Sequence, residues 1–187
     1  IVVDPGGRVA DIVRVAGEHG LEMHHVVNTN AHIDAVLGVD GIKSETGADF
    51  WLHQDAEPML AHMEEQARRF GIAASASPSV DRYLEPGETF SVGGLTLSVR
   101  HTPGHAPGHV TLVADSVPMD SGSHGFALVG DVIFFGGIGR TDLPGGDLET
   151  LMRSIDDQIL TLPDDMVLYS GHGPATTVGR ERQHNPF

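Results

Sequence analysis

The feature that most constrains this chain is a repeated pattern in which a hydrophobic run breaks into a short loop that carries histidine or aspartate, at three of its four places beside glycine or proline. The pattern recurs at residues 29–35, 102–105, 130–131 and 170–174. Loops at strand ends are where a rigid scaffold presents functional side chains. The pattern therefore predicts that polar residues from distant segments gather along one edge of the fold.

Hydrophobic periodicity indicates helices alternating with strands. Apolar residues at helical spacing predict helices over residues 9–19, 34–46, 56–70 and 148–160. Runs rich in β-forming residues predict strands over residues 21–28, 50–52, 89–92, 95–100, 110–114, 127–134 and 167–169. Two β-rich halves that each carry helices predict an α+β fold, a four-layer αββα sandwich. At 187 residues, a single domain over 1–187 is expected.

Charge and composition exclude several classes of partner. The net charge of −15 repels nucleic acid and anionic membranes, so neither is an expected partner. No run approaches the roughly 18 apolar residues of a membrane span. The chain has no cysteine, so any metal must be held by histidine and carboxylate groups. The absence of cysteine also fits a cytoplasmic protein.

The first residues of the chain read as the end of a strand followed by a turn at Asp4, Pro5 and Gly6. We therefore expect that a segment preceding this turn is missing. A sheet edge left uncovered in this way can pair with a second copy, so a homodimer is one expected assembly.

Imidazole and carboxylate groups in the polar loops form a candidate metal site. His32 and Asp34 lie two residues apart, and His105, Asp131 and His172 come from three later loops. These are the ligand types that divalent metals favour, and a catalytic site leaves one position open for water. We therefore expect these five side chains to converge on one edge of the fold.

Each candidate has an alternative interpretation. Asp34 also suits the N-cap of a helix. A lone histidine is most often only solvated or hydrogen-bonded, and this is the interpretation given to the remaining histidines, with His109 and His124 left open. Arg140, in the loop after Asp131, is a candidate for binding an anionic substrate group, but a salt bridge to Asp142 or Asp147 explains it equally well.

Taken together, these motifs resemble the metallo-β-lactamase superfamily, and within it the short glyoxalase II-like (hydroxyacylglutathione hydrolase-like) enzymes. The matching segments cover nearly the whole chain and are residues 4–7, 29–38, 101–109, 130–134, 139–147 and 170–187. The resemblance implies the metallo-β-lactamase-type sandwich. It also implies hydrolysis of a small-molecule acyl thioester, or a related acyl substrate, by metal-bound hydroxide. Zinc is the implied cofactor, with iron or manganese as alternatives.

The resemblance also assigns ligands to two metal ions, with Asp131 shared between them. The first ion would take position 30, His32, His105 and Asp131. Position 30 is asparagine here, so three of these ligands remain, together with a weak amide oxygen from Asn30.

The second ion would take Asp34, position 35, Asp131 and His172. Position 35 is alanine, which offers no ligand. Asp34 and Asp131 are the residues to which we assign catalytic roles. Three protein ligands plus water still make a legitimate catalytic zinc site, so we expect one or two ions at reduced occupancy.

Three functions remain open on the sequence. The first is a metal-dependent thioester hydrolase of reduced or altered activity. The second is a non-catalytic member of the family, natural or engineered. The third is an iron-dependent sulfur dioxygenase, which shares this fold, although Asn30 replaces a histidine that such chemistry uses.

Overall fold

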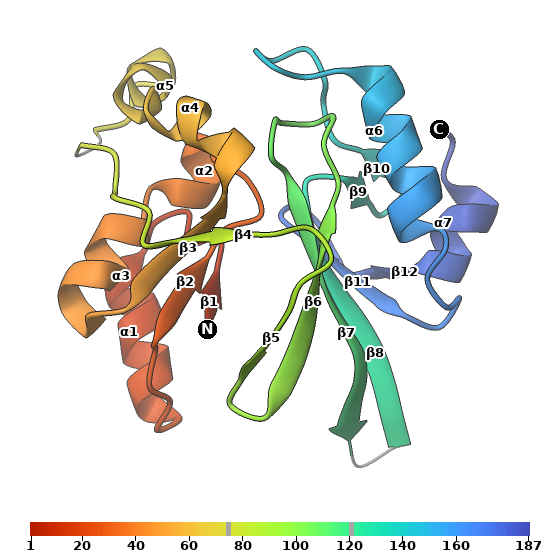
Figure 1. Ribbon diagram of the computed structural model, residues 1–187, viewed down its shortest axis with the longest axis horizontal. Helices are drawn as coiled ribbons and strands as arrows, with labels where there is room; N and C mark the ends of the chain where they lie inside the picture. Colours follow the sequence, from red (N-terminus) through yellow and green to blue (C-terminus); the bar gives the residue numbers. More distant parts are fainter. Residues whose placement is uncertain (74–75, 120–121) are drawn as a thin grey trace. The chain divides into compact units, whose positions relative to one another are not determined.

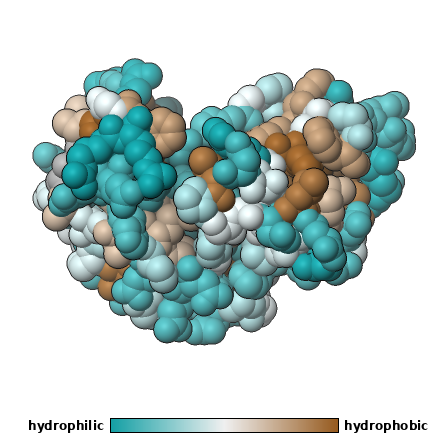
Figure 2. Space-filling model, turned by 90° about the horizontal axis from the view of Figure 1, so that it is seen from above, coloured by the Kyte–Doolittle hydropathy of each residue, from teal (hydrophilic) through white to brown (hydrophobic). Residues whose placement is uncertain are grey.

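The computed structural model describes residues 1–73, 76–119 and 122–187 and divides the chain into two compact units, Ile1–Leu84 and Glu85–Phe187. Each unit consists of a β-sheet with its own helices (Figure 1). Hydrophilic residues cover much of the face seen in Figure 2, which also shows a hydrophobic patch. Within the described ranges, no helix has the length and apolarity needed to cross a bilayer.

The first unit contains a four-stranded parallel sheet whose strand order follows the chain, β1-β2-β3-β4. Its strands are β1 (Val2–Val3), β2 (His25–Val27), β3 (Asp49–His53) and β4 (Arg82–Leu84). Helical segments fill the connections, and they are α1 (Val9–Glu18), α2 (Ile33–Val36), α3 (Val39–Thr46), the 3-10 turn η1 (Gln54–Ala56), α4 (Glu57–Leu60) and α5 (Met63–Arg69).

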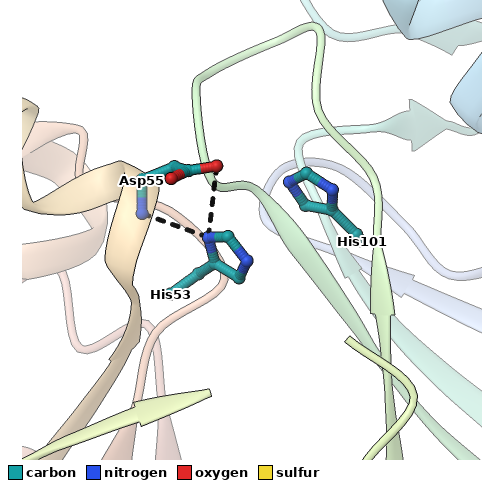
Figure 3. A group of neighbouring side chains, drawn as sticks. All are labelled: His53, Asp55 and His101. Atoms are coloured by element: carbon teal, nitrogen blue, oxygen red, sulfur yellow. Dashed lines mark hydrogen bonds and ion pairs between the residues drawn. The ribbon is translucent and has the colours of Figure 1, made fainter. Parts of the chain in front are cut away.

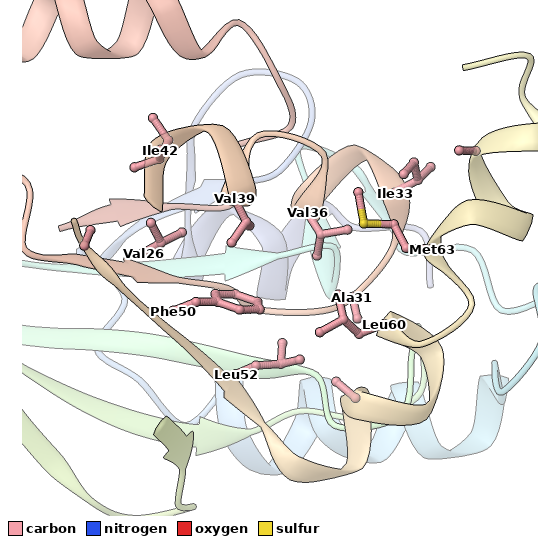
Figure 4. Close-up of a cluster of buried hydrophobic side chains, with 13 residues drawn as sticks. Val26, Ala31, Ile33, Val36, Val39, Ile42, Phe50, Leu52, Leu60 and Met63 are labelled. Carbon is pink, nitrogen blue, oxygen red and sulfur yellow. The ribbon is translucent and has the colours of Figure 1, made fainter. Parts of the chain in front are cut away.

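The core of this unit lies between the sheet and its helices (Figure 4). Phe50 and Leu52 of β3 are fully buried there, as is Ile42 of α3. Burying side chains of this size stabilises a fold by about 1.5–3 kcal/mol each. Ala31 and Ile33 belong to the same core, so the loop between β2 and α2 is anchored on both sides of His32.

The second unit contains a six-stranded mixed sheet in the order β12-β11-β8-β7-β6-β5 and a two-stranded hairpin, β9-β10. The strands are β5 (Thr89–Val92), β6 (Leu95–His101), β7 (Val110–Met119), β8 (Gly122–Gly130), β9 (Ile133–Phe134), β10 (Gly137–Ile138), β11 (Val167–Ser170) and β12 (Thr176–Thr177). The helices are α6 (Leu148–Ser154), the π-helical turn η2 (Ile155–Ile159) and α7 (Val178–His184). Leu151 and Ile159 pack with Val129 and Leu168 of the sheet to form a separate core.

The pairing of the strands in the second unit brings three loops to one edge of the sheet. β7 pairs antiparallel with both β6 and β8, so β6 and β8 run in the same direction. β11 pairs parallel with β8, with Ser170 opposite Gly130. The loops that leave the ends of β6, β8 and β11 therefore begin at a common edge, and these loops carry His105, Asp131 and His172.

Two predicted helices are shorter than the sequence indicated. The helix predicted over residues 34–46 is divided into α2 and α3 at Gly38. The Gly38 N–H donates to the carbonyl of Pro5, at 2.6 Å, instead of continuing the helical pattern. A side chain at position 38 would also lie 2.5 Å from that carbonyl oxygen. The helix predicted over residues 56–70 is likewise divided into α4 and α5.

The strand predicted over residues 127–134 is also two strands. β8 ends at Gly130, whose φ of 49° leaves the β region, and β9 begins only at Ile133. The chain changes direction in the turn between these strands, which contains Asp131. β1 lies where the sequence indicated the end of a strand, whereas the short strands β4, β10 and β12 and the helix α7 were not predicted. The observed mixture of helices and sheets confirms the predicted α+β class.

Candidate metal centre

In the first unit, the loop after β2 is held by the turn that follows β1. The Asp4 carboxylate accepts hydrogen bonds from the Thr29 N–H, at 2.7 Å, and from the Thr29 hydroxyl, at 2.8 Å. Asp4 has a φ of 48°, in the left-handed region that aspartate tolerates better than most residues. A side chain on Gly6 would overlap the carbonyl oxygen of Asp34. The turn and the loop can therefore pack together only with glycine at position 6.

Asn30 is fully engaged inside this loop. Its side chain is buried, and its Oδ1 accepts a hydrogen bond from the His32 N–H at 2.9 Å. Its Nδ2 donates to the Thr29 hydroxyl at 3.1 Å. Asparagine commonly stabilises turns by bonding to the backbone two residues further on. Asn30 thus uses its amide to stabilise the conformation of the loop.

The remaining candidates of the first unit lie at the start of α2. His32 is the N-cap residue of this helix and is buried, whereas Asp34 lies in its first turn and is exposed. The alternative interpretation of Asp34 as the N-cap is therefore wrong. Ala35 is buried, and its carbonyl accepts a hydrogen bond from Asn28 Nδ2 at 2.8 Å.

In the second unit, the Asp131 carboxylate lies between two imidazoles. Its Oδ2 is 3.5 Å from His105 Nε2, and its Oδ1 is 3.8 Å from His172 Nε2. Asp131 and His105 are buried, whereas the His172 side chain is 62% exposed. The structure thus brings together the three candidates of this unit, with each carboxylate oxygen facing a different histidine.

A backbone carbonyl fixes Nδ1 of the His105 ring as a hydrogen-bond donor. Its Nδ1 donates to the carbonyl oxygen of Arg140 at 2.8 Å. A neutral imidazole has one donor and one acceptor nitrogen, so Nε2 carries the lone pair on the side of Asp131. Metal-binding histidines typically hold their second ring nitrogen in this way.

The donor set of the second unit fits a metal. It offers two imidazole nitrogens and two carboxylate oxygens, which suit zinc, iron and manganese. Glycine at position 171 leaves room for the Asp131 carboxylate, because a Cβ atom there would lie 2.6 Å from Asp131 Oδ1. A carboxylate whose two oxygens face different histidines has the arrangement of a bridging ligand.

His109 is a residue whose role the sequence left open. It is completely buried, and its Nε2 accepts a hydrogen bond from the Asp131 N–H at 3.1 Å. Its Nδ1 is 3.0 Å from the Thr102 hydroxyl. His109 follows His105 by four residues in the same glycine-bearing segment, and this proximity was the available signal in the sequence.

Arg140 forms the salt bridge that was its alternative interpretation. Its Nε and one terminal nitrogen donate to the two oxygens of Asp142, at 2.7 and 2.8 Å. These hydrogen bonds hold the pKa of the Asp142 carboxyl below its usual range and raise the pKa of Arg140. Arg140 remains exposed, so its outer surface is accessible to solvent.

Two further histidines are hydrogen-bonded as expected. His53 ends β3, where its Nδ1 accepts from the Asp55 N–H at 3.2 Å and lies 4.0 Å from an Asp55 carboxylate oxygen (Figure 3). His62 Nδ1 donates to the Pro58 carbonyl oxygen at 2.7 Å. These contacts account for both residues as parts of the local structure.

Comparison with known sequences identifies the same family as the motifs did. The model of the metallo-beta-lactamase superfamily matches residues 1–172. The hydroxyacylglutathione hydrolase GloC of Haemophilus influenzae is 35% identical over 193 residues, which cover 100% of this chain and 85% of the relative. The probable metallo-hydrolase YqgX of Bacillus subtilis is also 35% identical, with 100% and 86% covered.

Solved structures show the same fold. BLEG-1, a B3 metallo-beta-lactamase, has a TM-score of 0.85 and 33% sequence identity, covering 99% of this chain and 86% of that one. TTHA1623 in a di-iron-bound form also has a TM-score of 0.85, with 34% identity, covering 99% and 87%. These similarities confirm the predicted fold.

Proposed function

Because the chain belongs to the metallo-beta-lactamase superfamily, we propose that it is a metal-dependent hydrolase of acyl thioesters that works with reduced metal occupancy. The observation that carries this proposal is the position of Asp131, with its carboxylate oxygens 3.5 Å from His105 and 3.8 Å from His172. The similarity to a hydroxyacylglutathione hydrolase supports the thioester as the substrate class. Zinc is the metal we propose, with iron or manganese as alternatives.

The ligand roles follow the family pattern. His32, His105 and Asp131 would hold one ion, and Asp34, Asp131 and His172 would hold the other. A bound divalent metal lowers the pKa of water to about 7 and so supplies a nucleophile for an acyl carbon at neutral pH. The lone pair on His105 Nε2, fixed by the bond from Nδ1 to a backbone carbonyl, supports its role as a ligand.

The carboxylates of Asp34 and Asp131 are the groups that we propose to handle the proton of the attacking water. An ionised carboxylate accepts hydrogen bonds only, so it orients water through its protons and can receive one of them. The water oxygen then forms a bond to the acyl carbon while the bond to sulfur breaks. The departing thiolate is a stable anion and needs little help from a general acid.

Reduced occupancy is proposed because each ion has lost one imidazole. Removing a ligand should weaken binding by at least the roughly 10–100-fold that outer-shell changes cause. Asn30 does not compensate simply, since its amide oxygen already accepts the His32 N–H at 2.9 Å. The chain should therefore hold fewer than two ions after dialysis.

We propose Arg140 as the contact for an anionic group of the substrate. Its pairing with Asp142 fixes the plane of the guanidinium, while the residue remains exposed. A guanidinium held in this way can still present a donor to a carboxylate. The proposed partner is thus a small acidic thioester rather than a macromolecule.

The test combines metal analysis with a hydrolysis assay. The purified chain is loaded with zinc, dialysed, and assayed on a hydroxyacyl glutathione thioester, with His24→Ala as a control for an exposed histidine. We expect fewer than two ions per chain and metal-dependent hydrolysis in both proteins. Metal binding without hydrolysis would favour the non-catalytic alternative, and oxygen uptake with a persulfide would favour the dioxygenase.

A further inference from the structure

His109 contacts two of the candidate ligands of the second unit, although it is not one of them. We propose that His109 is a positioning residue that fixes the geometry of His105 and Asp131 and thereby sets the metal affinity of the site. This inference rests on the proposed metal-dependent function, and it concerns how the site is built.

A chain of buried hydrogen bonds determines the protonation of His109. The Asp131 N–H can only donate, so His109 Nε2, at 3.1 Å, must accept and carries no proton. The proton of the neutral ring therefore lies on Nδ1 and is donated to the Thr102 hydroxyl at 3.0 Å. Thr102 in turn can donate to the hydroxyl of Thr111 at 3.1 Å.

All three side chains in this series of hydrogen bonds are buried, since His109, Thr102 and Thr111 are each 0% exposed. The backbone supports it further, because the Thr102 N–H donates to the His109 carbonyl at 2.8 Å. Losing one partner of a buried hydrogen bond leaves a polar group unsatisfied, which is costly. The ring orientation is therefore held from both nitrogens.

His109 also contacts the ring of His105. The two rings meet edge to face, with centroids 6.1 Å apart and an interplanar angle of 82°. His105 is held by the Arg140 carbonyl through its Nδ1. The buried side chain of His109 thus contacts both the His105 ring and the backbone of Asp131. The side chains of His105 and Asp131 approach each other to 3.5 Å between Nε2 and Oδ2.

A histidine that only filled space in the core would behave differently. Its substitution would change the stability of the metal-free protein, and any effect on the metal would follow that change. A positioning residue must instead show a dependence on which ring nitrogen is replaced. Glutamine can place its carbonyl oxygen near the position of Nε2, whereas asparagine reaches only the position of Nδ1.

The experiment compares His109→Gln with His109→Asn by zinc competition against a chromophoric chelator and by thermal unfolding of the metal-free proteins. We expect His109→Asn to lose about 10–100-fold in zinc affinity, as the loss of outer-shell contacts does, and His109→Gln to retain most of it. Thr102→Val, which removes the acceptor for Nδ1–H, should weaken zinc binding in the same direction and serves if either amide variant fails to fold. Equal zinc affinity in all the folded proteins would overturn the inference, and so would losses that simply follow thermal stability.

A nitrogen NMR spectrum of the His109 ring gives a readout that needs neither metal nor substrate. We expect the tautomer protonated on Nδ1, and protonation on Nε2 would reject the proposed bond to the Asp131 N–H. The two proposals can fail separately. Unchanged zinc affinity in the variants of an active hydrolase rejects only the role of His109. Zinc binding without thioester hydrolysis rejects only the substrate class.

Discussion

The loop after β2 in the first unit and the sheet edge in the second unit use their polar residues in opposite ways. In the loop, Asn30 bonds to the backbone of His32 and stabilises the turn itself. At the sheet edge, His105 and Asp131 face each other, while the His105 Nδ1–H donates to a backbone carbonyl and the Asp131 N–H donates to His109. The loop uses its polar side chains to hold its own shape, whereas the sheet edge gathers the residues that we propose as metal ligands.

This difference teaches that the loop after β2 can hold its shape through its own contacts. The amide of Asn30 offers a donor and an acceptor, and both are satisfied within two residues. The core residues Ala31 and Ile33 hold the loop independently of any metal. At the sheet edge, the Asp131 carboxylate instead faces the imidazole nitrogens of His105 and His172, at 3.5 and 3.8 Å.

The largest expected effect is at Asp131. Asp131→Asn removes the charge from the residue assigned to both ions, and we expect zinc affinity to fall by at least about 100-fold. His32→Gln removes a ligand of one ion only and should cost less. Chelator competition on both variants tests this ranking. A greater loss at His32 would reverse the contrast between the two regions.

The next effect is a rescue of the loop. Asn30→His together with Ala35→His should restore a second metal and raise thioester turnover by at least about tenfold, or roughly 1.36 kcal/mol off the barrier. The two changes should be strongly non-additive, because residues that act as a unit do not contribute separately. Both single variants and the double variant are assayed, with metals measured in each.

Two outcomes of this rescue would contradict different parts of the proposal. A double variant that binds two ions and hydrolyses no thioester would reject the substrate class. A double variant that binds no more metal than the parent would reject the ligand roles of positions 30 and 35. Asn30→His alone should also lower thermal stability, since it gives up the bonds of the amide to Thr29 and to the His32 N–H.

A smaller effect concerns a buried carboxylate in the second unit. Burial raises the pKa of Glu181, but hydrogen bonds from Thr176, the Gly136 N–H, Arg180 and Asn185 hold it below the ordinary value. A depressed pKa means that the stabilisation is present above about pH 4.3 and is lost as the pH falls through the folded-state value. Glu181→Gln should therefore lower the free energy of unfolding by about 1–3 kcal/mol at pH 7.

This cost should shrink on acidification, which urea unfolding at pH 7 and at acid pH can measure. Asp81 in the first unit provides the matched comparison. Burial raises its pKa, but hydrogen bonds from Lys43 and from the Phe50 N–H lower it below the usual range. The Asp81 side chain is 41% exposed, so Asp81→Asn should cost less than Glu181→Gln at pH 7. Equal costs would show that burial does not separate the two carboxylates.

The smallest expected effect is at Arg140. Arg140→Ala should raise the KM for an acidic thioester by up to about tenfold, with kcat little changed, if the guanidinium binds the substrate in its ground state. Asp142→Ala is the control, because it breaks the same salt bridge and keeps the cation. Identical kinetics in the two variants would assign Arg140 a structural role only.

Much of the fold was predictable because local patterns fix it. The strands over residues 89–92, 95–100 and 167–169 match β5, β6 and β11 closely, since turn residues bound each run. The division between α2 and α3 was not predictable, because it depends on a hydrogen bond between Gly38 and Pro5, far apart in the sequence.

The convergence of three candidate residues was predictable from the sequence, whereas the contacts that surround them were not. His105, Asp131 and His172 follow strands, and the pairing of those strands places them at one edge. The roles of Asn30 and His109 depend on which backbone N–H each side chain meets. That information lies in loop geometry and strand register, which residue types alone do not reveal.

The strand order of the first unit has a consequence for how the protein forms during synthesis. Each strand from β2 to β4 pairs with the strand that precedes it in the chain. As the chain leaves the ribosome, every new strand therefore finds its partner already present, and the sheet can grow from its N-terminal edge. In the second unit β11 joins β8 only after β9, β10, α6 and η2 have been synthesised, so its sheet is completed later. The loop that bears Asn30 should thus acquire its shape while the residues around Asp131 are still unmade.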